Sequence, residues 1–379
     1  MSIFKKTLSC AVLAALGTCA LAGCGRQDTS NEATTSASPE ASAAITETVN
    51  ESTAASEQTP TPGTQSTQPA DVTSTPFGQH GALHVENGKL TDADGNIVQL
   101  YGMSTHGIAW FPQYINYDSF RTLRDDWNTN CIRLAMYTAE YGGYCAGGDK
   151  EQLKQLVRDG VSYATELGMY VIVDWHILSD CDPNQNKDEA IAFFREMSEA
   201  FADNDNVLYE ICNEPNSGTS WDSIKSYAEE VIPAIREQKP DAVILVGTPT
   251  WSQEIDKAAA SPLTFDNIMY TLHFYAGTHK DDLRNRLETC AQNNLPVFVS
   301  EFGMCDASGN GANDFDSTTK WLDLLNKYQI SFCCWNLANK DESSSVFKAA
   351  STALFDWTDE DFNESGRWIR DYFRSMPRN

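Results

Sequence analysis

The chain has 379 residues, which allows one large domain or two ordinary ones. Its 27 Lys and Arg residues are outnumbered by 53 Asp and Glu residues, so the formal net charge is −26. Because nucleic acids and anionic lipid surfaces are also negative, this acidity argues against either of them as a partner.

The first 24 residues are typical of an export signal. Two lysines near the start precede an apolar run over residues 8–21, which is too short for a membrane span. The run ends in Leu-Ala-Gly-Cys at 21–24, a sequence that resembles a bacterial lipobox, in which Cys24 would be lipidated and become the mature N-terminus. An ordinary secretory signal cleaved nearby is the alternative. We favour the lipobox, and with it an exported cell-surface or outer-membrane lipoprotein, because the next segment has the composition of a tether.

Residues 25–76 form that segment. They include 12 Thr, 8 Ser, 8 Ala and 5 Pro, and no aromatic residue. Such a sequence cannot bury enough apolar area to fold, so it predicts a disordered linker. The linker would join a catalytic domain over residues 77–379 to the lipid, and the lipidated N-terminus would be the only contact with the membrane.

Strand-like and helix-like segments alternate along the domain. Eight short apolar or β-branched runs begin near residues 99, 131, 170, 207, 242, 268, 297 and 331. One helix is indicated by the apolar spacing of residues 153–167, and others are expected over 117–128, 187–201, 221–238, 280–293, 315–327 and 363–375. Eight such repeats predict a closed (β/α)8 barrel of the TIM type.

Two further features bear on this fold. An open doubly wound sheet is the competing architecture, but it usually carries a glycine-rich phosphate loop after the first strand, and residues 102–107 do not form one. Upstream, Ala82 to Val98 alternates apolar and polar residues around two turn sequences. This pattern predicts a short β-hairpin that closes the bottom of the barrel.

A barrel also predicts where chemistry would occur, because the carboxyl ends of its strands converge on one face. The polar and aromatic residues at those ends are His106, Arg133, His176, Asn213, Glu214, His273, Tyr275, Glu301 and Trp335. Two carboxylates among aromatic and histidine side chains are typical of a glycosidase pair. Arg133 could instead be a buried structural ion pair, but an arginine inside a strand is costly without carboxylates around it.

These residues also carry a resemblance to a known family. The chain resembles glycoside hydrolase family 5, and within it the bacterial endo-β-1,4-glucanase (cellulase) subfamily, from about Gly81 to Phe373. The matching segments are Gln99–Gly107, Ile132–Tyr137, Asp174–His176, Tyr209–Pro215, His273–Tyr275, Ser300–Gly303 and Trp335–Leu337.

The resemblance implies a role for each core residue. Glu214 would be the general acid/base and Glu301 the nucleophile of a retaining mechanism, which needs one protonated and one ionised carboxyl. Arg133 and the Tyr275 hydroxyl should favour the ionised form of Glu301. Asn213 would hydrogen-bond the sugar 2-hydroxyl at the cleavage subsite. His176 and His273 would hold the polar network and the substrate in place.

The resemblance also implies sugar-binding residues on both sides of the cleaved bond. Trp335 would form a sugar platform at a minus subsite, and the peptide bond between Trp335 and Asn336 should be cis, as in the family. The residues that resemble outer parts of the substrate cleft are His106, Trp110, Tyr137, Lys340 and Glu342, with Trp251 on the plus side. Trp110 and Trp251 could equally be loop packing, and Lys340 and Glu342 a solvated pair.

The cysteines do not predict a metal site. No C-x-x-C pair or His/Cys cluster is present in the domain, and neither a metal nor an organic cofactor is expected. Cys131, Cys212 and Cys333 lie in strand-like runs and are expected to be buried thiols. Cys145 and Cys181 follow neighbouring strands, and export would permit a disulfide between them.

Three functions remain open on the sequence. The leading one is an endoglucanase, expected to act as a monomer, that cuts internal β-1,4 bonds of cellulose or mixed-linkage β-glucan by double displacement. The second applies the same mechanism to mannan or xylan, because loops decide specificity. The third is a lipid-anchored, non-catalytic glycan-binding protein.

Overall fold

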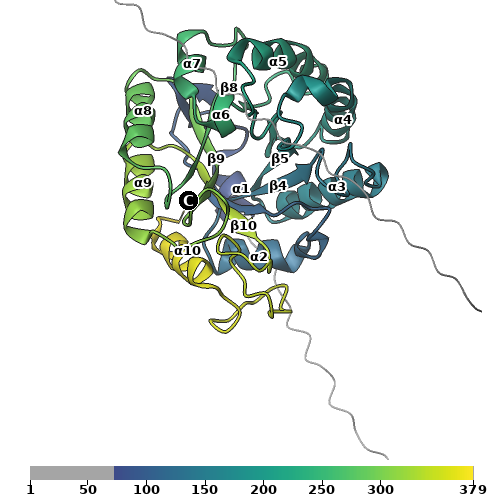
Figure 1. The fold of residues 1–379 in the computed structure, drawn as a ribbon. Coiled ribbons are helices and arrows are strands. Elements are labelled where there is room, and N and C mark those ends of the chain that lie inside the picture. Colours follow the sequence, from purple (N-terminus) through teal and green to yellow (C-terminus); the bar gives the residue numbers. More distant parts are fainter. Residues whose placement is uncertain (1–71, 379) are drawn as a thin grey trace, which may run out of the picture. The chain divides into compact units, whose positions relative to one another are not determined.

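The computed structural model describes residues 72–378, and within them eight parallel strands close into a barrel (Figure 1). The strands neighbour one another in the order β10-β3-β4-β5-β6-β7-β8-β9. Their bounds are β3 Tyr101–Thr105, β4 Cys131–Tyr137, β5 Tyr170–His176, β6 Val207–Glu210, β7 Ile244–Val246, β8 Ile268–Tyr275, β9 Val297–Gly303 and β10 Phe332–Leu337. The predicted (β/α)8 barrel is therefore confirmed, and the open sheet is excluded.

Helices surround the barrel as the alternating pattern predicts. The longer ones are α2 Tyr117–Asp125, α3 Lys150–Glu166, α4 Lys187–Ala200, α5 Trp221–Arg236, α8 Asp281–Gln292, α9 Phe315–Lys327 and α10 Glu364–Ser375. The shorter ones are η2 Pro112–Tyr114, η3 Pro183–Asn186, α6 Pro249–Ser252 and α7 Ile255–Ala260. In α3 the Asp149 side chain caps the first turn, and the buried face contains Leu153, Val157 and Val161.

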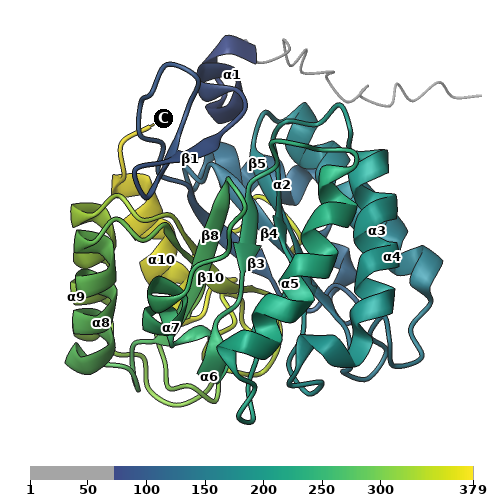
Figure 2. The same cartoon turned by 90° about the horizontal axis from the view of Figure 1, so that it is seen from above.

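The bottom of the barrel is closed by the predicted hairpin. Strands β1 (His84–Glu86) and β2 (Lys89–Thr91) pair antiparallel, and they lie with α1 (Pro76–His80) at the opposite end of the barrel from α6 (Figure 2). Leu83 and Leu90 join Tyr170 and Leu245 in one buried apolar cluster. The hairpin thus covers residues that would otherwise expose the barrel interior to water.

The predicted end of the linker at residue 76 is wrong by a few residues. The chain is already helical at η1 (Val72–Ser74), and Pro76 begins α1. The Thr75 side chain accepts a hydrogen bond from the Gly78 N–H, and the Phe77 N–H donates to the Gly168 carbonyl at 2.8 Å. Linker composition concealed this start because a capping threonine and a helix-initial proline are also common linker residues. The predicted signal segment, Cys24 and linker residues 25–71 lie outside the described residues.

The predicted disulfide between Cys145 and Cys181 is also wrong. Both thiols are free, as are the other six cysteines of the described residues. The Cys181 Sγ instead lies 3.3 Å from both the Ser179 carbonyl and the Ser217 hydroxyl. Within residues 72–378, no helix combines the length and the apolar character needed to cross a bilayer.

Candidate active site

A cleft of about 550 Å³ lies at the carboxyl ends of the barrel strands. Its walls include most of the residues that the sequence nominates, namely His106, Tyr137, His176, Glu214, Trp251, His273, Tyr275, Glu301, Trp335, Lys340 and Glu342. Arg133 and Asn213 are completely buried beside these residues, and Trp110 contacts the His106 ring. The barrel therefore brings every nominated residue of the domain to one end of the fold.

The two carboxylates face each other across this cleft. One carboxylate oxygen of Glu214, one of Glu301 and a ring nitrogen of His273 all lie within 4.8 Å of one another. Retaining glycosidases hold their carboxyl groups about 5–5.5 Å apart, whereas inverting enzymes leave about 6.5–9.5 Å for a water molecule. The spacing matches direct attack by one carboxylate on the sugar.

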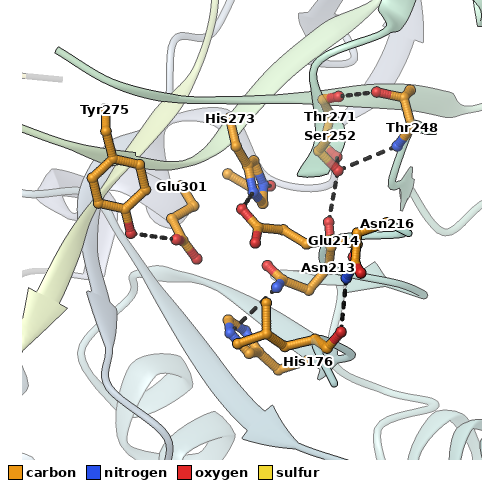
Figure 3. Close-up of polar contacts among 12 residues, drawn as sticks. His176, Asn213, Glu214, Asn216, Thr248, Ser252, Thr271, His273, Tyr275 and Glu301 are labelled. Atoms are coloured by element: carbon orange, nitrogen blue, oxygen red, sulfur yellow. Dashed lines mark hydrogen bonds and ion pairs between the residues drawn. The ribbon is translucent and has the colours of Figure 1, made fainter. Parts of the chain in front are cut away.

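Glu301 is held by donors on both of its oxygens. The Tyr275 hydroxyl donates to Oε1 at 2.8 Å, and the Arg133 guanidinium donates to Oε2 at 3.1 Å (Figure 3 shows the tyrosine contact). Glu301 is only 4% exposed, so both contacts act in a protein environment with little water. The two donors therefore fix the orientation of the carboxylate, as a nucleophile requires.

Arg133 makes the largest set of contacts in the site. It is fully buried on β4 and donates twice to Glu210, at 2.7 and 3.1 Å, and once each to Glu301, Asn213 and Ser104. Burial would raise the pKa of Glu210, but the Arg133 charge, together with His273, lowers it to about 2. Arg133 also lies 3.0 Å from Asp174 Oδ2, so several buried carboxylates make a buried arginine acceptable here.

A hydrogen-bond chain runs from Glu214 back to Glu210. His273 Nδ1 lies 3.0 Å from Glu214 Oε1, and its Nε2 lies 2.9 Å from the Ser300 hydroxyl, which donates to Glu210 Oε1 at 2.7 Å. Burial would lower the pKa of His273, but the carboxylates of Glu210, 3.8 Å from Nε2, and of Glu214 raise it to about 9. At neutral pH the ring is therefore protonated, so the pair formed by His273 and Glu214 holds a proton beside the cleft.

His176 has the opposite electrostatic environment. Burial, with a further contribution from the Arg133 charge, lowers its pKa to about 4, so the ring is neutral at pH 7. The Asn213 amide N–H faces His176 Nε2 at 3.3 Å, and Nδ1 lies 2.6 Å from Asp174 Oδ2. These partners assign the ring proton to Nδ1. The neutral ring can then stack beneath Trp335, with centroids 5.2 Å apart and planes inclined by 15°.

The Asn213 amide has protein partners on both ends. Its N–H groups point to the Ile177 carbonyl at 3.0 Å and to His176, and its oxygen accepts from Arg133 at 2.7 Å. A hydrogen bond from Asn213 to a sugar 2-hydroxyl stays a prediction, and it would have to replace or share the 3.3 Å contact with His176.

Aromatic rings gather on one side of the carboxylates. The peptide bond from Trp335 to Asn336 is cis, as predicted. The ring of His106 lies 5.0 Å from that of Trp335 and 5.4 Å from that of Trp110. Lys340 Nζ lies 5.8 Å from the centre of the Trp110 ring and 2.6 Å from Glu342 Oε2. Trp110 is 38% exposed, so this group offers an open aromatic face next to polar hydrogen-bonding groups.

Trp251 follows β7, which lies across the barrel from β3, and it lines the cleft with 44% of its surface exposed. Several residues that line the cleft were not nominated from the sequence: Leu178, Gln253, His279, Ala307, Ser308 and Gly309. They lie in loops after the strands, where sequence patterns are weakest. Glu210 was also missed, although a signal existed, because an arginine inside a barrel strand requires carboxylates around it, and here they come from β5 (Asp174) and β6 (Glu210).

Comparison with known proteins agrees with this geometry. The family model described as Cellulase (glycosyl hydrolase family 5) matches residues 91–341. The chain belongs to glycosyl hydrolase family 5. It is 50% identical over 300 residues to Endoglucanase A of Butyrivibrio fibrisolvens, covering 78% of this chain and 70% of that protein. It is 47% identical over 307 residues to an endoglucanase of Clostridium saccharobutylicum, covering 80% and 67% respectively.

A solved structure shows the same family 5 architecture. The catalytic domain of the endoglucanase Cel5A from Thermobifida fusca, in complex with cellotetraose, superposes with a TM-score of 0.76 at 42% identity. The match covers 79% of this chain and 100% of that domain.

Proposed function

We propose that this family 5 chain is a retaining endo-β-1,4-glucanase that cuts internal bonds of cellulose or mixed-linkage β-glucan by double displacement. The observation that carries the proposal is the carboxylate pair, with oxygens of Glu214 and Glu301 within 4.8 Å, in a cleft with aromatic rings on both sides. Aromatic faces pack against the C–H faces of sugars, so chain segments on either side of the cleaved bond can bind. The cellotetraose-bound relative supports a β-1,4-linked glucan as the substrate.

The first half of the reaction forms a covalent glycosyl-enzyme. Glu301, ionised beside Arg133 and Tyr275, attacks the anomeric carbon and forms a bond to it. The bond from that carbon to the glycosidic oxygen breaks, and Glu214 gives its proton to the departing oxygen. This is the proton that His273 and Glu214 hold between them across 3.0 Å, so its transfer leaves His273 neutral and Glu214 ionised.

The second half returns the enzyme to its initial state. Glu214, now ionised, takes a proton from a water molecule, and the resulting hydroxide attacks the same carbon. The bond to Glu301 breaks and releases a sugar with the original anomeric configuration. Two inversions therefore give net retention.

The cellular setting is part of the proposal. The apolar run, the Leu-Ala-Gly-Cys sequence at 21–24 and the Ser/Thr/Pro-rich residues after it support a lipid on Cys24 and a tethered extracellular domain. All described site residues come from one chain, so a monomer suffices for the reaction. Metabolic labelling with a fatty acid, compared with a Cys24→Ala variant, tests the anchor, and light scattering of the domain tests the monomer.

The activity is tested with a substrate panel of carboxymethylcellulose, lichenan, mannan and xylan. We expect reducing-sugar release from the first two, with products that retain the β-anomer in early NMR spectra. Glu301→Gln should lower kcat by at least about 1,000-fold, because the nucleophile is lost. Glu288→Gln is a matched control, because Glu288 pairs with Lys327 on the outer helices.

The panel also separates the alternatives. Hydrolysis of mannan or xylan in place of glucan would move the proposal to another polysaccharide. Full activity of Glu301→Gln would refute the assignment of the nucleophile. Glycan binding with no hydrolysis by the wild type would leave only a binding function.

A further inference from the structure

The loop after β7 contains an unusual backbone turn. Thr250, Trp251 and Ser252 have φ angles of 59°, 53° and 53°, so three successive residues with side chains lie in the left-handed region. This region is uncommon for any residue other than glycine and is least favourable for β-branched threonine. Such a turn persists only when surrounding contacts hold it, and it is commonly found where function requires it.

One of those contacts is a buried hydroxyl that connects the turn to the catalytic segment. The Ser252 Oγ donates to the Asn213 carbonyl at 2.7 Å and is completely buried. It also accepts from the Thr248 N–H at 3.2 Å and from the Thr271 hydroxyl at 3.0 Å. Figure 3 shows Ser252 between Asn213 on one side and Thr248 and Thr271 on the other. The hydroxyl thus joins β8, the loop after β7 and the segment after β6.

The backbone on both sides of Glu214 is held in the same way. The Trp251 N–H donates to the Pro215 carbonyl at 2.9 Å, and the Asn216 side chain donates to the Glu214 carbonyl at 2.9 Å. Each carbonyl from Asn213 to Pro215 therefore accepts a hydrogen bond, and the turn supplies two of the three donors. The position of the Glu214 carboxyl group consequently depends on the turn.

The same turn presents a ring to the substrate. Trp251, whose N–H is one of these two donors, lines the cleft and is 44% exposed. A sugar on Trp251 would belong to the leaving group, and Glu214 must protonate the oxygen of that same leaving group. Their relative placement matters, because a displacement of 1 Å can cost about 100-fold in rate.

We propose that Ser252 is a positioning residue that fixes the Trp251 platform and the Glu214 acid in one rigid unit, so that the leaving sugar is held in register with its proton donor. The inference rests on the proposed function. Ser252 touches no substrate and acts only through the Asn213 carbonyl and the turn.

The experiment compares two leaving groups in Ser252→Ala and Ser252→Gly variants. Cellotetraose has a leaving sugar that needs a platform and a proton, whereas 2,4-dinitrophenyl β-cellobioside has a leaving group that departs without protonation. We expect kcat/KM for cellotetraose to fall about 10- to 100-fold. For the dinitrophenyl substrate we expect a change of less than about 3-fold, since its first step does not use the acid.

Paired variants separate the hydroxyl from the backbone. Glycine tolerates the left-handed region, so equal selective losses in Ser252→Ala and Ser252→Gly would assign the effect to the hydroxyl. Ser198→Ala is a matched control, because Ser198 is a fully buried serine of α4 whose hydroxyl bonds the Arg195 carbonyl. It should leave both substrates unaffected.

Equal losses on both substrates, or no loss on cellotetraose, would overturn the inference. If Ser252→Ala does not fold, Thr271→Val is the second variant, because it removes only the hydroxyl that donates to Ser252. Its kcat/KM for cellotetraose should fall about 3- to 10-fold, with no matching loss on the dinitrophenyl substrate. An equal loss on both substrates would again refute the inference. A wild-type enzyme inactive on both substrates would refute the proposed function instead.

Discussion

Replacing Arg133 by methionine tests the charge network that holds the site. Methionine keeps an unbranched side chain but removes all five N–H donors, and each of these donors has a partner: Glu210 twice, Glu301, Asn213 and Ser104. Arg133 is fully buried, so the carboxylates left behind cannot be rehydrated. We expect both the stability and the nucleophile to be affected.

The size of the effect follows from the buried contacts that are lost. Breaking a buried ion pair by removing one partner costs about 3–5 kcal/mol. The Arg133 charge also opposes the effect of burial on Glu210 and, with His273, lowers the pKa of Glu210 to about 2. We therefore expect Arg133→Met to lower the free energy of unfolding by about 3–5 kcal/mol at pH 7.

The pH dependence gives the sign of the effect. A carboxyl group with a depressed native pKa stabilises the fold above its unfolded pKa, here 4.5, and this contribution is lost as pH falls toward 2. The difference between wild type and Arg133→Met should therefore shrink between pH 4.5 and pH 2.

The assay is urea unfolding followed by tryptophan fluorescence at pH 7, 4 and 3, with Arg133→Lys as the variant that keeps the charge but loses the planar fork. Arg133→Lys should fall between wild type and Arg133→Met. A loss below about 1 kcal/mol at pH 7, a difference that does not change with pH, or a lysine variant as unstable as the methionine variant would refute the reasoning.

Three further predictions test other parts of the site and barrel. Tyr275→Phe removes one charge-assisted hydrogen bond to Glu301, so kcat/KM should fall about 10- to 150-fold (about 1.5–3 kcal/mol) while the melting temperature stays close to that of wild type; an unchanged kcat/KM would contradict this role. Protonated His273, with a pKa of about 9, should stabilise the fold by on the order of 3 kcal/mol below pH 6.5 and lose that contribution as pH rises through 9. The free energy of unfolding of the wild type should therefore differ between pH 6 and pH 9.5, and His273→Gln should lack that difference. In Gly102→Ala, the new Cβ would lie 1.9 Å from the Cys131 carbonyl oxygen on the adjacent strand. Urea unfolding should therefore show that the free energy of unfolding falls by about 1–3 kcal/mol. Wild-type stability of this variant would mean that the two strands can move apart without cost.

Much of the architecture could be predicted from local sequence. Each strand begins within two residues of its predicted position, because fully buried parallel strands are continuous apolar runs that alternate with amphipathic helices. The errors fall where local composition is ambiguous. Val72–Pro76 looked like linker, because Thr75 and Pro76 are typical both of linkers and of helix starts. Cys145 and Cys181 looked suitable for pairing, because the sequence places them in neighbouring loops. It does not show in which direction each side chain points.

The convergence of the two carboxylates and the aromatic rings beside them was also predictable from the sequence, since strand-end positions in a barrel converge by topology. Some of their supporting partners were not nominated. Glu210, Ser300 and Ser252 are ordinary residues in their local context, and only the closed barrel places Glu210 against Arg133 and the Ser252 hydroxyl against Asn213.

The sequence by itself determined which residues are available for catalysis, because element periods and residue types are local properties. Only the tertiary structure decided their charge states and their positions relative to one another. A pKa depends on burial and on charges brought together from distant strands. His273 and His176 illustrate this difference. Both are buried histidines at strand ends, yet one is protonated at neutral pH beside two glutamates and the other is neutral beside Arg133.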